Sequence, residues 1–210
     1  MKIAVIGSGI SGLSSAFYLS KKYKVDLLEQ DDHFGGHSYT YDIKNSSKTI
    51  PVDLGFIVFN ELTYPNLINF FKELKVPFEK SDMSFSVSVQ NTNVEYGGSG
   101  PRAIFANKNN IFNFDFLKMI KEIITFYKKA PFLLKKDLNG VTLGSYLNTS
   151  KFSKYFIEYH IIPMVAAIWS MPFSKAKDMP LELFLKFFIN HGLFKFKNRP
   201  QWYTVSNRSR

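Results

Sequence analysis

The chain of 210 residues has no cysteine, two tryptophans and no apolar run long enough to cross a bilayer. The absence of cysteine excludes disulfides, thiolate chemistry and a cysteinyl link to a cofactor. A chain without disulfides fits the cytoplasm, so we expect a cytoplasmic location. The longest apolar run away from the N-terminus, residues 161–173, has thirteen residues, fewer than a spanning helix needs. The apolar start is broken by three glycines and lacks an A-x-A site, which argues against a signal peptide.

Acidic residues are scarce relative to basic ones. Lysine and arginine number 27 and aspartate and glutamate 17, which gives a net charge of +10. Such a surplus can attract nucleic acid or an anionic membrane. The basic residues are scattered as pairs, such as Lys21-Lys22 and Lys128-Lys129, and form no block. We therefore expect no nucleic-acid partner and attribute most of the charge to compositional bias.

The N-terminal residues have the pattern of a β-α-β unit. Residues 2–6 (KIAVI) form a short, β-branched apolar run that predicts a buried parallel strand. Residues 10–23 have helical periodicity, and residues 24–29 (KVDLLE) predict a second strand. Such a unit, about thirty residues long, begins a doubly wound sheet.

A glycine motif joins the first strand to the helix. It matches G-x-G-x-x-G with the residues Gly7, Ser8, Gly9, Ile10, Ser11 and Gly12. The three glycines would serve the tight turn, the approach to a pyrophosphate and helix packing, respectively. Glu29, 22 residues after Gly7 and followed by Gln30, can accept hydrogen bonds from an adenosine ribose and would repel a 2′-phosphate. We interpret the motif as a dinucleotide site; the alternative is a glycine-rich turn with an incidental glutamate.

Two further segments resemble a known superfamily. Residues 34–40 (FGGHSYT) are similar to the R-x-G-G-R-x-x-T segment of the flavin amine oxidases, phytoene desaturases and protoporphyrinogen oxidases, and residues 53–55 (DLG) resemble their D-x-G element. The resemblance implies non-covalent FAD. It adds five cofactor-binding candidates, namely Gly35, Gly36, His37, Asp53 and Gly55. Histidines, His33 and His37, stand where that family has arginines, so neutralisation of the phosphates at neutral pH is in doubt.

Phrases further along the chain narrow the resemblance. FIVFNELTYPNL, IIPMVAAIWSMP and RPQWYTV look like a bacterial branch described as predicted NAD/FAD-binding proteins. The resemblance implies an FAD-dependent oxidoreductase, with hydride transfer from a small hydrophobic substrate, of which an acyl lipid is one candidate, to the flavin. It assigns no catalytic residue. His160 and His191 are isolated, so we expect no metal site.

The fold class that we expect is α/β, with a Rossmann-like, glutathione-reductase-type FAD-binding βαβ core and a largely helical cap or substrate subdomain. We place the core at residues 1–100, the cap at 101–198 and a return to the FAD domain at 199–210. Further elements are expected as a hairpin (40–43 and 49–52, turning at 45–47), strands at 84–90 and 94–96, and helices at 64–74, 113–128, 143–147, 152–169 and 181–190.

Two alternatives concern the whole chain. Members of the family generally run to about twice this length, so we expect a C-terminally truncated chain that binds FAD poorly by itself. It is then a non-catalytic remnant, or one half of a split flavoprotein that needs a partner chain. Residues 181–197 (LELFLKFFINHGLFKFK) also have a Phe/Leu-with-Lys pattern, which suggests peripheral membrane contact or cap packing.

Overall fold

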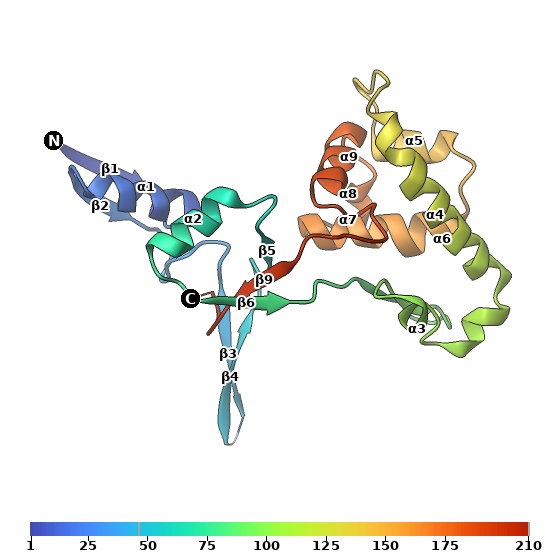
Figure 1. Ribbon diagram of the computed structural model, residues 1–210, viewed down its shortest axis with the longest axis horizontal. Helices are drawn as coiled ribbons and strands as arrows, with labels where there is room; N and C mark the ends of the chain where they lie inside the picture. Colours follow the sequence, from blue (N-terminus) through green and yellow to red (C-terminus); the bar gives the residue numbers. More distant parts are fainter. Residues whose placement is uncertain (46, 210) are drawn as a thin grey trace. The chain divides into compact units, whose positions relative to one another are not determined.

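The computed structural model describes residues 1–45 and 47–209, which fold into two compact units (Figure 1). The first unit comprises Met1–Met83 and Pro200–Arg210, and the second comprises Ser84–Arg199. Residues 84–100, which the sequence prediction assigned to the first domain, group with the second unit. The second unit is therefore an insertion into the first.

The first unit opens with the expected β-α-β arrangement. Strands β1 (Lys2–Ile6) and β2 (Lys24–Leu28) pair in parallel, and α1 (Ile10–Ser20) connects them. The prediction that the first strand is buried is wrong: Ile6 is 85% exposed, and α1 has no buried residue. The exposed face of this two-stranded sheet is mixed: it carries Ala4, Ile6 and Leu28 beside Lys2 and Lys24.

A hairpin and a helix follow. Strands β3 (Thr40–Asn45) and β4 (Lys48–Asp53) pair antiparallel, in agreement with the predicted hairpin. Ser46, part of the predicted turn, lies outside the described residues. Helix α2 (Pro65–Glu73) has its proline in the first turn, where a missing N–H costs nothing.

A three-stranded antiparallel sheet closes the first unit, and the sequence did not reveal it. Its order is β5 (Phe59–Asn60), β9 (Trp202–Val205) and β6 (Phe78–Ser81), so the strand from the chain's end lies in the middle (Figure 1). Phe59 contacts Phe78 and Tyr203 edge-on or stacked, with ring centroids 5.5 and 6.3 Å apart. Because these strands are short, they make few backbone hydrogen bonds, and the aromatic contacts add stability to the sheet.

The second unit is mostly helical. Its elements are β7 (Ser86–Ser88), β8 (Glu95–Gly97), α3 (Pro101–Ile104), the 3₁₀-helix η1 (Lys108–Phe112), α4 (Phe114–Leu133), α5 (Leu143–Thr149), α6 (Lys154–Phe156), the π-helix η2 (Ile157–Ile161), α7 (Ile162–Trp169), α8 (Phe173–Ala176) and α9 (Leu181–Asn190). Its core is one continuous cluster of buried residues between Val94 and Phe194.

The packing of α4 and α9 shows which of their apolar residues lie inside the unit. In α4 the apolar residues Leu117 and Ile124 are 37% and 40% exposed, and the buried face is centred on Phe116, Met119 and Phe126. Apolar residues lie on both faces of this helix, so the contacts of the folded unit decide which face is inside. In α9 the apolar residues Leu181, Phe184, Leu185 and Phe188 are buried in the core, which is the cap-packing alternative for that segment.

The helix predicted at residues 152–169 is interrupted by a π-helix. Pro163, in the first turn of α7, has no N–H to donate to the carbonyl of Tyr159 four residues earlier. The hydroxyl of Tyr96 donates to that carbonyl instead, at 2.7 Å. A proline and a tyrosine from a distant strand together explain the local change of helix type.

The same tyrosine belongs to a buried polar chain. His160 Nδ1 lies 3.0 Å from the Tyr96 hydroxyl, and Nε2 lies 3.0 Å from the Tyr127 hydroxyl. Since Tyr96 gives its only proton to Tyr159, Nδ1 must donate to Tyr96 and Nε2 must accept from Tyr127. Burial lowers the pKa of His160 to about 3 and raises the pKa values of both tyrosines. The imidazole is therefore neutral, with both nitrogens satisfied.

Candidate functional site

The first glycine turn links β1 to α1. Gly7 has a φ of +90°, a conformation that favours glycine, and its N–H donates to the Leu28 carbonyl at 2.7 Å. Gly9 is the N-cap of α1, and its carbonyl accepts the first helical bond, from the Leu13 N–H at 2.9 Å. In an α-helix the N–H groups between these two residues have no helical acceptor and point out of the N-terminus. The turn therefore presents donors to an anion.

The glycines of this turn differ in their surroundings. A Cβ on Gly12 would lie 1.8 Å from the carbonyl oxygen of Gly7, so only glycine allows the helix to approach the strand so closely. A Cβ on Gly9 would meet no atom within 4 Å. Gly12 therefore serves packing, while the space beside Gly9 is open to a ligand. The side chains of Ile10 and Ser11 are exposed at the start of the helix.

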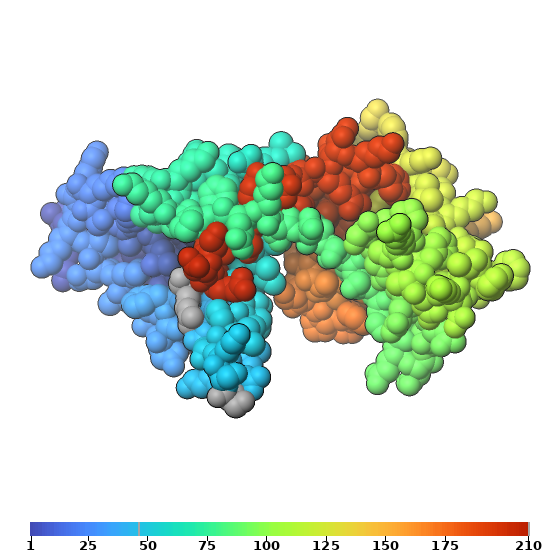
Figure 2. Space-filling model, turned by 60° about the horizontal axis from the view of Figure 1, so that its bottom comes forward, coloured from blue at the N-terminus to red at the C-terminus, as the bar shows by residue number. Residues whose placement is uncertain are grey.

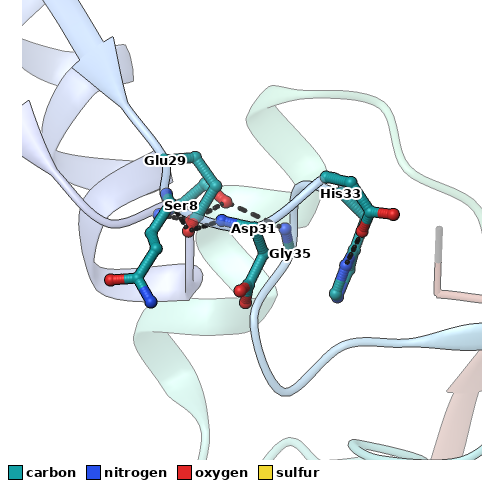
Figure 3. A network of polar contacts seen from close by, with 7 residues as sticks. Ser8, Glu29, Asp31, His33 and Gly35 are labelled. Carbon is teal, nitrogen blue, oxygen red and sulfur yellow. Dashed lines mark hydrogen bonds and ion pairs between the residues drawn. The ribbon is translucent and has the colours of Figure 1, made fainter.

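Glu29 is bonded directly to this turn (Figure 3). Its Oε2 accepts from the backbone N–H and the hydroxyl of Ser8, at 2.6 and 2.5 Å. Its Oε1 accepts from the N–H groups of Gln30 and Asp31, at 2.7 and 3.0 Å. Gln30 thus contacts Glu29 through its backbone N–H and not through its side chain. The carboxylate is fixed by four donors, which occupy its acceptor positions.

These donors change the acidity of Glu29. The Ser8 hydroxyl, followed by the backbone N–H groups of Asp31, Ser8 and Gln30, lowers the pKa of Glu29 to about 2. Hydrogen bonds to the charged form stabilise it. Glu29 therefore carries a negative charge throughout the physiological pH range.

The second glycine turn meets the first. The N–H of Gly35 donates to the Ser8 carbonyl at 3.0 Å, and the Ser8 side chain is fully buried. A Cβ on Gly36 would lie 3.0 Å from Gly9 Cα, so the two turns are in close contact. Gly36 also has a φ of +57°. The two glycine segments, predicted separately, form one surface around Gly9.

The D-x-G element lies beside the residue that follows the second turn. A Cβ on Gly55 would lie 1.7 Å from the His37 carbonyl oxygen, to which Phe56 donates its N–H at 3.0 Å. The side chain of His33 contacts residues of its own loop. Its Nδ1 is 3.2 Å from the Asp32 carboxylate, and its ring is 4.8 Å from that of Tyr39. The structure thus directs His33 toward its own loop, as Figure 3 shows.

Asp53 has partners that the sequence did not reveal. Its Oδ1 accepts from the Thr40 hydroxyl at 2.6 Å and from the N–H and hydroxyl of Ser209, at 3.2 and 3.1 Å. Partial burial raises the pKa of Asp53, but these hydrogen bonds and the charge of Arg208 outweigh that effect, so the pKa is lowered. Thr40 belongs to the family-like segment at residues 34–40. No local sequence pattern indicates the contact of Ser209 with Asp53, because the two residues are 156 positions apart.

Residues 5–74 match the family model described as an NAD(P)-binding Rossmann-like domain. This segment is a Rossmann-like domain. It contains both glycine turns, Glu29 and the D-x-G element. No match was found among curated protein sequences.

Solved structures extend the comparison to the whole chain. Putrescine oxidase bound to putrescine aligns with 99% of this chain and 47% of its own, at 18% identity and a TM-score of 0.63. Cyclohexylamine oxidase from Brevibacterium oxydans (99% and 46%, 16% identity, TM-score 0.61) and an oxidoreductase from Methanosarcina mazei (100% and 46%, 17%, 0.55) are also similar. The chain spans about half the length of these structures and shares their fold.

Proposed function

We propose that this chain carries residues that hold FAD non-covalently and that it is the cofactor-binding portion of an FAD-dependent oxidoreductase. The observation that carries the proposal is the contact between the two glycine turns, with Gly36 against Gly9 and Ser8 bonded to Glu29. The likeness of the fold to amine oxidases supports it.

The residues of the first turn fit the ADP part of the cofactor. The N-terminus of α1 offers N–H groups and a partial positive charge to the pyrophosphate. Glu29 would accept a ribose hydroxyl. Its backbone donors are fixed, whereas the Ser8 hydroxyl can rotate, so we infer that the ribose replaces the Ser8 Oγ on Oε2. The charge of Glu29 would also disfavour a 2′-phosphate.

When bound, FAD would supply the hydride acceptor for oxidation of a C–N or C–C bond. The chain's own residues would hold and orient the cofactor at the two turns and keep Glu29 ionised. For the substrate we retain a small hydrophobic molecule, with an acyl lipid as one candidate. No residue of the chain is assigned as a catalytic acid or base.

Flavin binding tests the proposal directly. The protein would be expressed from its complete reading frame and titrated with FAD while flavin absorbance and fluorescence are followed, with NAD and NADP added as competitors. We expect FAD to bind stoichiometrically and NADP to bind worst. Absence of a flavin spectrum after reconstitution would overturn the proposal.

A second candidate is one half of a split flavoprotein, or a non-catalytic remnant. The observation that favours it is that the chain spans about half the length of the structures that it matches. Co-expression with the product of a neighbouring gene would distinguish these possibilities. A complex that binds FAD when the chain alone does not would support the split protein.

A further inference from the structure

The start of α4 exposes a group of large apolar side chains. Phe112 and Phe114 are 84% and 86% exposed, and Ile111 and Leu117 are 47% and 37% exposed. We call these four residues the α4 tip. They lie on η1 and the first turn of α4, the yellow-green segment at the lower end of α4 in Figure 1, which is also on the surface seen in Figure 2. Single exposed apolar residues are common in proteins, but neighbouring ones mark interaction sites.

The backbone of the α4 tip is held by three asparagines. Asn107 donates to the Asn93 carbonyl at 2.7 Å and accepts from the Asn109 N–H at 3.0 Å. Asn110 is buried and donates to the Glu95 carbonyl at 2.9 Å, and Asn113 caps α4 by accepting from the Phe116 N–H at 3.1 Å. The two phenylalanines thus extend from a segment whose backbone these hydrogen bonds hold in place.

Cationic side chains surround the α4 tip. Lys108 is in η1, and Lys118 and Lys121 follow Phe114 by four and seven residues, on the same face of the helix. A shallow hollow next to this face is lined by Lys118, Lys121, Glu122, Thr125, Lys151 and Phe152. Two acids oppose the lysines: exposed Asp115, and Glu122, which accepts from the Ser153 N–H at 3.0 Å. Within the described part of the chain, these four lysines form no ion pair.

We propose that the α4 tip docks on a membrane surface that contains anionic phospholipid. The phenylalanines would enter the interface between headgroups and acyl chains, and the lysines would contact the headgroup phosphates. The tip is too small for a stable protein partner: four partly exposed side chains present on the order of 400 Å², about half of what each partner buries in a standard interface. The positive charge around it matches an anionic lipid surface.

This surface differs from the one that the sequence suggested. In the segment at residues 181–197, Leu181, Phe184, Leu185 and Phe188 are buried in the core, and the exposed Leu183 and Phe196 lie thirteen residues apart. Among the described helices, none is long and apolar enough to cross a membrane. Contact with lipid would therefore be peripheral at this site.

Vesicle co-sedimentation tests the proposal. The chain would be pelleted with vesicles of phosphatidylcholine alone or mixed with phosphatidylglycerol, at low and high salt. We expect binding to the anionic vesicles that salt weakens. The Phe112→Ser/Phe114→Ser variant should lower the partition coefficient by about tenfold or more. The Lys118→Gln/Lys121→Gln variant should lower binding to anionic vesicles by about tenfold and reduce the salt dependence.

Two matched variants serve as controls. Phe132→Ser/Phe173→Ser removes two phenylalanines that are each 63% exposed elsewhere, and Lys128→Gln/Lys129→Gln removes the same charge from α4. Both should bind vesicles as the wild type does, and circular dichroism would verify that every variant is folded. The proposal fails if the wild type does not pellet, if the controls lose as much binding as the tip variants, or if sedimentation velocity shows instead a dimer that the Phe112→Ser/Phe114→Ser variant abolishes.

Discussion

At the scale of single residues, Gly9 and Gly12 differ in what an added methyl group meets. In Gly12→Ala the new Cβ would lie 1.8 Å from a backbone oxygen, so α1 must move away from β1. We expect a loss of stability of about 1–3 kcal/mol. In Gly9→Ala the Cβ meets nothing, and φ is an ordinary −65°, so the fold should be unchanged. The measurement is urea unfolding of both variants.

FAD affinity should be lowered directly in Gly9→Ala, whose effect therefore differs from the loss of stability expected for Gly12→Ala. The methyl group of Gly9→Ala would occupy the space that we assign to the pyrophosphate. FAD affinity should fall by at least about tenfold, or about 1.4 kcal/mol, although the protein remains folded. Wild-type affinity in a folded Gly9→Ala protein would place the phosphates elsewhere.

Glu29 gives a prediction about pH. Its folded pKa of about 2 is below the ordinary value of 4.5, so its contribution to stability is complete above about pH 4.5 and is lost as the pH falls through the folded pKa. The wild type should be more stable than Glu29→Gln at neutral pH, and this difference should shrink toward pH 2. Carbon NMR of the Glu29 carboxyl group would give its midpoint directly. A midpoint near 4.5 would contradict the four-donor arrangement.

The site could be predicted in part from these residues. The G-x-G-x-x-G spacing and Glu29 are local to one β-α-β unit, so the sequence shows them. The sequence did not show that Ser8 hydrogen-bonds to Glu29, because Ser8 stands at an x position of the motif and the fold brings the two residues together. The pairing of Ser209 with Asp53 joins the two ends of the first unit, and no local pattern records it.

At the scale of elements, the chain of Tyr127, His160 and Tyr96 joins α4, η2 and β8. Tyr96→Phe would remove the acceptor of the His160 Nδ1–H and the hydroxyl that donates to the Tyr159 carbonyl. We expect a loss of about 1–3 kcal/mol, measured by chemical denaturation. Tyr155→Phe is the control, because its hydroxyl makes no hydrogen bond within the described structure. Equal stability of both variants would show that the network contributes little.

The same network predicts acid sensitivity of the second unit. His160 is held neutral with a folded pKa of about 3, whereas an unfolded histidine titrates at about 6.5. The unfolded state therefore binds the proton first, and stability should fall as the pH drops from 6.5 toward 3. In His160→Gln this part of the pH dependence should disappear. Denaturation midpoints at several pH values would test it, and an unchanged slope would refute it.

Elements were predictable where their signal was local. The first strand and α9 were predicted with their observed bounds, because the first is a short apolar run that ends before Gly7 and the second begins directly after Pro180. Strands β5, β6 and β9 were missed, because two to four residues carry little pattern and their partners are remote. The π-helix η2 could not be predicted from residues 152–169 alone, because Tyr96, which contacts it, lies outside that segment.

At the scale of the molecule, the two units differ in their cores. The continuous buried cluster lies entirely in the second unit. Among the described residues, the buried apolar side chains of the first unit are Phe59, Ile68, Phe70 and Trp202. We therefore expect residues 84–199, expressed alone, to unfold cooperatively with near-ultraviolet circular dichroism from packed aromatics. A non-cooperative transition would show that this unit depends on the first.

The position of β9 has a consequence for biosynthesis. It lies between β5 and β6, so this sheet cannot assemble until the residues after the second unit have left the ribosome. Translation at about 5–20 residues per second separates β6 from β9 by roughly ten seconds, while the second unit, with its contacts nearby in sequence, can already fold. Until β9 is available, the nascent first unit would wait with the facing edges of β5 and β6 unpaired.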